Sequence, residues 1–353
     1  MNLAKFGWNT DLQEALEVVE NKELVPGRVT LEHKRMYRVL TEQGELLAEV
    51  SGKLRFQAED REDYPAVGDW VILSPRYQEG KATIHGVLPR FSKFSRKVAG
   101  DTTEEQIVAT NVNSVFLVNA LNQDFNIRRL ERYLLLTWES GANPVVVLTK
   151  SDLCEDISSK IAAVESVALG VPIHITSAKD LTGLEDLQGY LQEGQTVALL
   201  GSSGAGKSTL TNYLLGEEKL LVQDIREEDG KGRHTTTHRE LVLLPSGGMI
   251  IDTPGMRELQ LWEAEGSMSH SFSDIEQIAE KCFYRDCKHE NEPNCAVREA
   301  IENGQLDEKR FQSFVKLQRE LAYLDRKNDK KAQLAEKAKW KKVAGDRTRI
   351  HRK

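Results

Sequence analysis

Hydrophobic and polar positions alternate over short segments in the first quarter of the chain. Five segments rich in strand-forming residues are separated by Gly or Asp, and they read GRVTL, MYRVL, ELLAEVSG, VGDWVILS and KATIHGVL. Pro65, Gly68 and Asp69 in YPAVGDW are typical of a turn. Five short strands without a long helix between them predict a small closed barrel, such as an OB-fold, over residues 26–95. Such barrels bind RNA but also serve as scaffolds, so both roles stay open.

The period of the pattern changes from about residue 107. Apolar runs now alternate with amphipathic segments of 10 to 15 residues, which predicts a mostly parallel sheet with helices on both faces. The expected helices are NIRRLERYLLLTWES, DISSKIAAVESVALG, GLEDLQGYLQ and the segment after GKS. After residue 270 the pattern is helical and polar, interrupted by a cluster of cysteines.

One loop in this region has the residues that hold nucleotide phosphates. It fits G-x-x-x-x-G-K-[ST] and consists of Gly201, Ser202, Ser203, Gly204, Ala205, Gly206, Lys207 and Ser208. Glycines let backbone N–H groups close around phosphate oxygens at the positive end of the next helix. Lys207 would reach the β- and γ-phosphates, and the Ser208 hydroxyl would ligate Mg²⁺. The motif lies between a predicted strand and a predicted helix, so it indicates a nucleotide site.

Two further motifs follow the phosphate loop. Asp252 and Gly255 belong to DTPG at the end of the apolar run MIID, where the Asp would hold Mg²⁺ through water and the Gly N–H would sense the γ-phosphate. The polar loop GRHTTT lies between the phosphate loop and DTPG, and it is suited to be the first switch. We expect Thr236 of this loop to complete the Mg²⁺ shell.

The guanine-reading motifs come before the phosphate loop. Thr149, Lys150, Ser151 and Asp152 form TKSD, close to the N/T-K-x-D tetrapeptide of GTPases. Asp152 would accept hydrogen bonds from N1–H and the 2-amino group of guanine, which adenine cannot offer. Ser177 and Ala178, in TSA, match the loop whose backbone reads guanine O6. The motif order is therefore 4-5-1-2-3, which predicts a circularly permuted GTPase domain.

Three of the four cysteines are crowded together with a histidine. Cys282, Cys287, His289 and Cys295 form C-x4-C-x-H-x5-C. Three thiolates and an imidazole at short spacing suit tetrahedral Zn²⁺, and a closed set of four ligands indicates a structural ion. A metal-dependent hydrolase at this cluster is disfavoured because no ligand position is left open. Cys154 stands apart, as a small core or surface residue.

Charge is spread unevenly along the chain. Residues 326–353 hold twelve Lys/Arg against three Asp/Glu, a net charge of +9. Because the whole chain has a net charge of −7, the remaining residues must have a net charge of −7 − 9 = −16. A basic tail on an acidic body suggests a polyanionic partner, although a solvated, partly helical tail explains the charge equally well. No apolar run reaches membrane-spanning length and no secretory signal is visible, so we expect a cytoplasmic protein without membrane contact.

Together the predicted barrel, the permuted motifs and the cysteine spacing resemble the bacterial ribosome small subunit-dependent GTPase A family over nearly the whole chain. The resemblance implies a monomeric factor that binds GTP and GDP and the 30S ribosomal subunit, hydrolyses GTP when bound, and acts late in subunit maturation. It implies that the barrel and the zinc module contact 16S rRNA. It also extends the GTP-binding roles from the phosphate loop to Thr209.

The resemblance further points to His234, in GRHTTT, as the group that assists hydrolysis. Position 256 is Met, where Ras-like enzymes place a water-orienting Gln. A His234 that only contacts rRNA or solvent is the alternative. A second hypothesis for the whole protein is an RNA-binding checkpoint module in which GTP only sets affinity.

These motifs divide the chain into five expected parts: an N-terminal extension (1–25), an all-β OB-fold barrel (26–95), an α/β P-loop GTPase domain (96–262), an α-helical zinc-binding module (263–325) and a basic tail (326–353).

Overall fold

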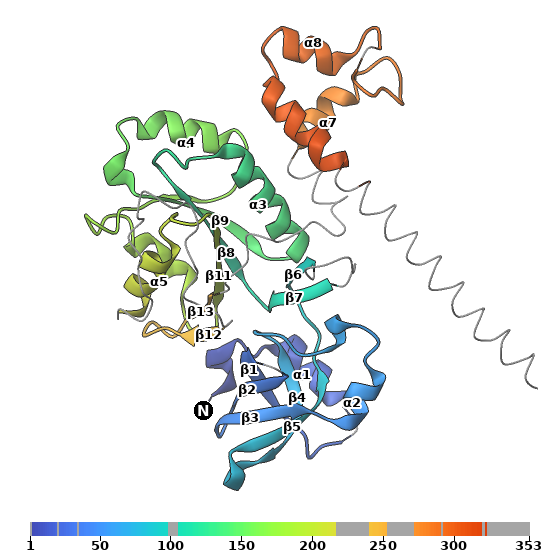
Figure 1. Ribbon diagram of the computed structural model, residues 1–353, viewed down its shortest axis with the longest axis vertical. Coiled ribbons are helices and arrows are strands. Elements are labelled where there is room, and N and C mark those ends of the chain that lie inside the picture. Colours follow the sequence, from blue (N-terminus) through green and yellow to red (C-terminus); the bar gives the residue numbers. More distant parts are fainter. Residues whose placement is uncertain are drawn as a thin grey trace, which may run out of the picture. The chain divides into compact units, whose positions relative to one another are not determined.

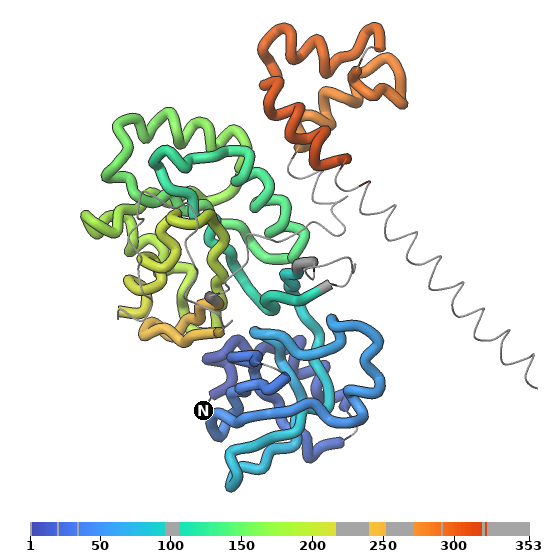
Figure 2. Tube along the Cα trace, viewed as in Figure 1, coloured from blue at the N-terminus to red at the C-terminus, as the bar shows by residue number. Residues whose placement is uncertain are grey.

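The computed structural model describes residues 2–19, 21–33, 35–97, 105–216, 240–252, 272–290, 292–319 and 322 (Figures 1 and 2). Internal contacts divide the chain into two compact units, Met1–Gln260 and Leu261–Lys353. The GRHTTT loop, Gly255, Met256 and the basic tail lie outside the described residues.

The first unit contains a closed five-stranded barrel near its N-terminus (Figure 1). Its strands pair in the order β1-β2-β3-β5-β4, and β4 returns to pair with β1. The pairing of β3 with β5 is parallel and the others are antiparallel. The predicted OB-fold barrel is thus confirmed. The strands are β1 (Val25–His33), β2 (Met36–Thr41), β3 (Gly44–Val50), β4 (Trp70–Arg76) and β5 (Lys81–Val87).

Alternation along the strands fills the barrel. In β2 and β3 every second side chain is buried, and the interior includes Val39, Leu46 and Ile84. The predicted turn is present before β4, where the Asp69 N–H donates to the Ala66 carbonyl at 3.1 Å. A short helix that the pattern did not predict, α2 (Gly52–Gln57), lies between β3 and β4.

The second part of this unit is a six-stranded sheet in the order β10-β9-β8-β11-β13-β12. All neighbours are parallel except β12, which runs antiparallel to β13. The central strands are buried along almost their whole length, as expected for a sheet covered on both faces. The strands are β8 (Ser114–Ala120), β9 (Asn143–Thr149), β10 (Ile173–Ile175), β11 (Thr196–Gly201), β12 (Glu240–Leu243) and β13 (Met249–Asp252).

Three helices of this domain agree with the amphipathic segments: α3 (Ile127–Ser140), α4 (Ile157–Glu165) and α5 (Lys207–Leu215). The fourth expected helix, GLEDLQGYLQ, is the shorter 3₁₀ helix η5 (Glu185–Tyr190). Leu184, Leu187 and Tyr190 recur every three residues, which is the period of a 3₁₀ helix, and the two leucines are fully buried. The sequence pattern also did not predict the hairpin of β6 (Lys93–Lys97) and β7 (Glu105–Thr110).

Barrel and GTPase sheet are joined edge to edge. Strand β12 pairs with β1 at Leu31 and Glu240, and Arg38 of β2 lies 3.3 Å from the Glu240 carboxylate. The N-terminal segment, with η1 (Leu3–Phe6) and α1 (Thr10–Glu17), also contacts the GTPase domain, because the Gly194 N–H donates to the Lys5 carbonyl at 3.2 Å.

The second unit has a small helical core of its own. It contains α7 (Ser273–Ala279), α8 (Ala296–Glu302) and a helix over residues 308–319. Phe272 packs on Phe314 with ring centroids 5.4 Å apart, and Arg310 forms a bidentate pair with Asp274 at 2.7 and 2.8 Å. None of the helices in the described part of the chain is long and apolar enough to span a bilayer.

A buried arginine of β1 links four separate segments of the first unit. The guanidinium of Arg28 donates to the carbonyls of Phe6, Gly68 and Asn111, the last at 3.0 Å, and its Nη1 lies 3.4 Å from the sulfur of Met249 on β13. Burial lowers the pKa of Arg28 to about 9, so the group is still charged at neutral pH. A buried charge of this kind is tolerated only when it is hydrogen-bonded, which makes these carbonyls essential partners.

We therefore expect Arg28→Met to destabilise the first unit by about 3 kcal/mol, because the change leaves several buried carbonyls without their donor. Urea unfolding followed by tryptophan fluorescence measures this, since Trp8 and Trp70 pack edge to face beside the arginine. Arg76→Met, at a half-exposed arginine of the same barrel, is the matched control and should change stability little. Equal unfolding midpoints for both variants would show that Arg28 is not a structural link.

Candidate functional site

The predicted nucleotide motifs lie at one edge of the parallel sheet. TKSD, the phosphate loop and DTPG begin at the last residues of β9, β11 and β13, and TSA directly follows β10. The strand ends are in register, with Thr149 opposite Ala120 and Gly201 opposite Val118. The carboxyl ends of parallel strands form the usual ligand crevice of such sheets. Segments far apart in the chain therefore meet where a nucleotide can bind.

The phosphate loop approaches its neighbours so closely that it needs glycine. A Cβ on Gly201 would lie 2.4 Å from the Val118 carbonyl oxygen, and Gly206 has a φ of +95°. The loop leads directly into α5, and the positive N-terminal end of a helix favours binding of an anion. The ammonium of Lys207 lies within the loop and donates to the carbonyls of Gly201 at 2.8 Å and Ser202 at 2.6 Å. Ser203, Gly204 and Ser208 are exposed toward solvent.

TKSD contacts the phosphate loop directly. The Thr149 hydroxyl donates to the Ala205 carbonyl at 2.6 Å, although 56 residues separate the two. Both residues are buried, and the bond joins the end of β9 to the phosphate loop. Lys150, next in the motif, has a φ of +57°, which turns the chain sharply into the 3₁₀ helix η4 (Ser151–Leu153).

TKSD also contacts TSA, the second guanine motif. The Ser177 hydroxyl donates to the Asp152 carboxylate at 2.9 Å, and the Ser151 N–H donates to the Thr176 carbonyl at 3.2 Å. Asp152 itself is exposed, whereas Ser177 is buried. The structure thus brings the two motifs together and leaves the carboxylate of Asp152 accessible to a ligand.

For the switch motifs the structure describes only the backbone of Asp252, at the end of β13. His234, Thr236 and Gly255 lie outside the described residues. Their roles stay predictions.

One loop of this edge was not singled out from the sequence. Residues 121–126 connect β8 to α3, and the carboxylate of Asp124 accepts a hydrogen bond from the Ser202 hydroxyl in the phosphate loop. The same loop lines a hollow of about 640 Å³ together with Leu153, Cys154 and Lys160. The signal that could have found it is the run of polar residues directly after a buried strand, NQD.

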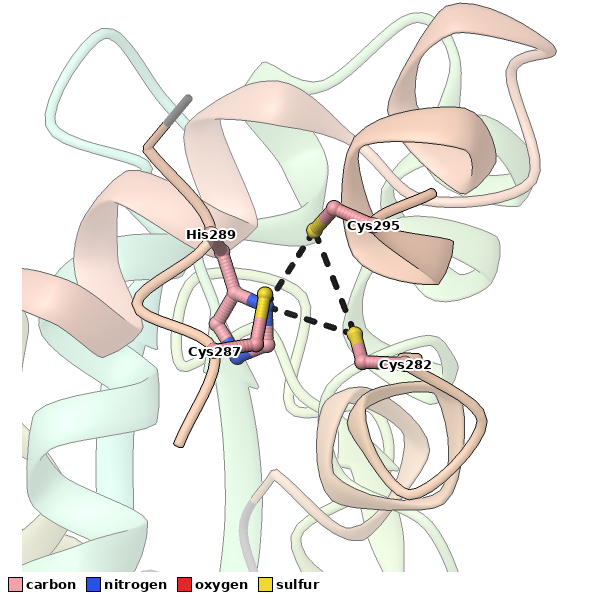
Figure 3. A group of neighbouring side chains, drawn as sticks. All are labelled: Cys282, Cys287, His289 and Cys295. Atoms are coloured by element: carbon pink, nitrogen blue, oxygen red, sulfur yellow. Dashed lines mark hydrogen bonds between the residues drawn. The ribbon is translucent and has the colours of Figure 1, made fainter. Parts of the chain in front are cut away.

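The cysteine cluster of the second unit is formed as its spacing predicts (Figure 3). One ligand atom from each of Cys282, Cys287, His289 and Cys295 lies within 4.8 Å of the others. The Sγ atoms of Cys282 and Cys295 are 3.9 Å apart, and His289 Nδ1 lies 3.6 and 3.3 Å from them. Tetrahedral metal–sulfur bonds of about 2.3 Å put neighbouring sulfurs about 3.8 Å apart. The cluster therefore has the size and the donor set of a structural metal site.

His289 is held for this role by its surroundings. Its φ of +60° turns the backbone between Cys287 and Cys295, and its ring packs against Phe311 with centroids 6.0 Å apart. Burial lowers the pKa of His289, so that at neutral pH the ring is uncharged and can donate a lone pair to a metal.

A phosphate loop preceded in the chain by both guanine motifs, all at one sheet edge, defines a circularly permuted GTPase. Comparison with known proteins agrees. The family model described as RsgA GTPase matches residues 87–262. An overlapping match to the ABC transporter model, at residues 184–342, includes the phosphate loop that P-loop ATPases and GTPases share.

Relatives match over the whole chain. The chain is 52% identical to small ribosomal subunit biogenesis GTPase RsgA 1 of Oceanobacillus iheyensis, covering 98% of each protein, and 45% identical to RsgA of Opitutus terrae, covering 99% of this chain and 98% of that one. YjeQ from Thermotoga maritima superimposes with a TM-score of 0.62 at 30% identity, over 85% of this chain and 99% of that structure. YloQ, a circularly permuted GTPase, superimposes with a TM-score of 0.61 at 25% identity, over 86% and 96%. The chain belongs to the RsgA family of small ribosomal subunit biogenesis GTPases.

The cluster geometry predicts what loss of one ligand does. Cys287→Ala should lose the bound metal and loosen residues 272–319, because a unit this small depends on its metal for folding energy. Elemental analysis and limited proteolysis measure the two effects, and nucleotide affinity should stay within about twofold of the parent because the nucleotide motifs belong to the other unit.

Cys154→Ala is the control, since Cys154 belongs to the first unit, and it should retain all the metal. A parent protein that is fully folded and free of metal would contradict the assignment, as would undiminished metal content in Cys287→Ala.

Proposed function

We propose that this GTPase binds the 30S ribosomal subunit, that the subunit stimulates its hydrolysis of GTP, and that it assists late maturation of the subunit by contacting 16S rRNA. The observation that carries the proposal is the meeting of TKSD, TSA and the phosphate loop at one sheet edge, in a chain whose relatives are small-subunit biogenesis GTPases. We further propose that it acts as a monomer in the cytoplasm.

Guanine recognition is assigned to the two connected loops. Asp152 accepts hydrogen bonds from N1–H and the 2-amino group of the base, and Ser177 holds its carboxylate in place at 2.9 Å. The backbone of Ser177 and Ala178 reads O6, while the stem of Lys150 lies along the base. Thr149 ties this reading site to the phosphate loop through Ala205.

The phosphates belong to the loop from Gly201 to Thr209. Its N–H groups and Lys207 hold the β- and γ-phosphates, and Ser208 binds Mg²⁺. Asp252 and Thr236 complete the surroundings of the ion, and Gly255 senses the γ-phosphate. His234 orients the attacking water when the protein is bound to the 30S subunit.

Both the barrel and the zinc module offer surfaces suited to rRNA. Phe56 of α2 is 90% exposed, beside exposed Lys53 and Arg55, and Phe283 of the cysteine cluster is 71% exposed, beside exposed Arg285. Exposed rings stack on unpaired bases and neighbouring cations contact phosphates, which supports RNA contact at both surfaces. We assign Zn²⁺ to the four ligands because three thiolates with one imidazole in a closed tetrahedron is its usual structural site.

Nucleotide choice tests the base-reading role. Asp152→Asn should weaken GTP binding roughly a hundredfold, because two charge-assisted acceptor contacts are replaced by a donor and an acceptor. The same variant should gain affinity for xanthosine triphosphate, whose 2-oxo group accepts the new donor. Equilibrium titration with both nucleotides measures this.

The matched control is Asp156→Asn, four residues further on. Asp156 caps α4 by accepting the Ser159 N–H at 3.0 Å, and Asn caps equally well, so GTP affinity should not change. If Asp152→Asn bound GTP as tightly as the parent, TKSD would not be the guanine site.

Turnover with purified 30S subunits tests the catalytic proposal. His234→Ala should abolish most of the stimulated GTP hydrolysis, while GTP affinity and 30S binding stay within a few-fold of the parent, because in-line positioning of water dominates phosphoryl transfer. Rate and subunit co-sedimentation are measured in the same samples.

Loss of stimulation through lost 30S binding would assign His234 to docking, and full stimulated turnover would remove it from catalysis. Failure of 30S subunits to stimulate the parent protein would contradict the proposed function itself. Release from the subunit at equal rates with GTP and with a non-hydrolysable analogue would favour a checkpoint module in which GTP only sets affinity.

A further inference from the structure

The carboxylate of Asp124 contacts the phosphate loop but has none of the nucleotide-binding roles assigned above. Asp124 sits in the 121–126 loop between β8 and α3, and one of its carboxylate oxygens accepts the hydroxyl proton of Ser202 in a hydrogen bond. Its other carboxylate oxygen lies 3.0 Å from Nη2 of Arg129, in the first turn of α3. Ser202 is 9% exposed and the Asp124 side chain is 41% exposed, so the bond is buried at its serine end and open to solvent at its carboxylate end.

The loop that carries Asp124 is itself firmly held. At its start the Leu121 N–H donates to the Thr149 carbonyl at 2.8 Å, which attaches it to TKSD. Within it, the Asn122 side chain accepts the Asp124 N–H at 3.0 Å. At its end Asn126 caps α3 by accepting the Arg129 N–H at 2.9 Å. The carboxylate is therefore placed by its own loop and does not depend on Ser202 for its position.

Ser202 in turn faces two ways. Its hydroxyl donates to Asp124, and its carbonyl accepts the Lys207 ammonium at 2.6 Å. We propose that Asp124 is a positioning residue for the phosphate loop. By accepting the hydrogen bond of the Ser202 hydroxyl, Asp124 fixes the position of the Ser202 carbonyl, and this carbonyl aligns Lys207 with the nucleotide phosphates. Arg129 in turn holds the Asp124 carboxylate in place through their ion pair. The proposal rests on the assignment of Gly201–Ser208 to the phosphates.

Electrostatics and positioning predict opposite results for removal of this carboxylate. A negative charge near a polyphosphate repels it, so on charge alone Asp124→Ala should tighten nucleotide binding. If the carboxylate instead orders the loop, the same variant must bind nucleotide more weakly. The sign of the change therefore separates the two effects.

The experiment uses the full-length protein and titrates GDP and GTP against Asp124→Ala, Ser202→Ala and the double variant. Each single change should weaken binding about tenfold, the size expected for a hydrogen bond to a charged group. The double variant should be no weaker than the weaker single variant, because both changes break the same bond. Asp124→Asn keeps an acceptor oxygen for Ser202 and should return affinity to within about threefold of the parent.

Two controls make the result decisive. Asp186→Ala removes an exposed carboxylate of η5 in the same domain and should leave affinity unchanged. Lys207→Ala should abolish tight binding; if it does not, the phosphate-loop assignment fails, whatever Asp124 does. Melting temperatures show whether Asp124→Ala is folded, and if it is not, Ser202→Ala and Asp124→Asn alone decide.

Normal or tighter binding by the folded Asp124→Ala, or by Ser202→Ala, would overturn the proposal. So would additive losses of about a hundredfold in the double variant, because they would show that the two residues act separately.

Discussion

The nucleotide site depends on one constraint, the parallel pairing of β8 with β9 on one side and β11 on the other. This pairing puts the end of β9 beside the start of α5, so that the Thr149 hydroxyl reaches the Ala205 carbonyl. It also places the 121–126 loop between the base-reading and phosphate-binding segments, where Asp124 meets Ser202. Because the geometry comes from neighbouring strand ends, the order in which the chain visits those strands does not matter.

The sequence was sufficient for features whose signal is local. Strand alternation predicted the closed barrel, buried runs predicted the parallel sheet, and ligand spacing predicted the cysteine cluster. It did not reveal the contacts of Arg28 and Asp124, because these cross 83 residues to Asn111 and 78 residues to Ser202 and involve ordinary polar side chains. The sequence also did not show that the helix η5 is of the 3₁₀ type, because leucines spaced by three fit both helix types over so short a segment.

The two units are stabilised in different ways. The first has extensive apolar cores and a buried arginine of the barrel, Arg28, which contacts the N-terminal segment at Phe6, the carbonyl of Asn111 and Met249 of the GTPase sheet. The described residues of the second form a small aromatic core, the bidentate Arg310–Asp274 pair and a cluster of four possible metal ligands. Small folds commonly need such a cross-link because they bury too little apolar surface to offset chain entropy. Metal loss should therefore affect the two units very differently.

The permuted strand order has a consequence for how the protein is made. Strand β8 emerges from the translating ribosome with β9 and β10, but its other partner, β11, begins only at Thr196, after η5. Until then the apolar edge of β8 has no partner on that side, and such an edge is a template for pairing with other chains. Pairing across long sequence separations is also slow. During synthesis this GTPase thus has an unpaired strand edge between completion of β10 and arrival of its phosphate-loop strand.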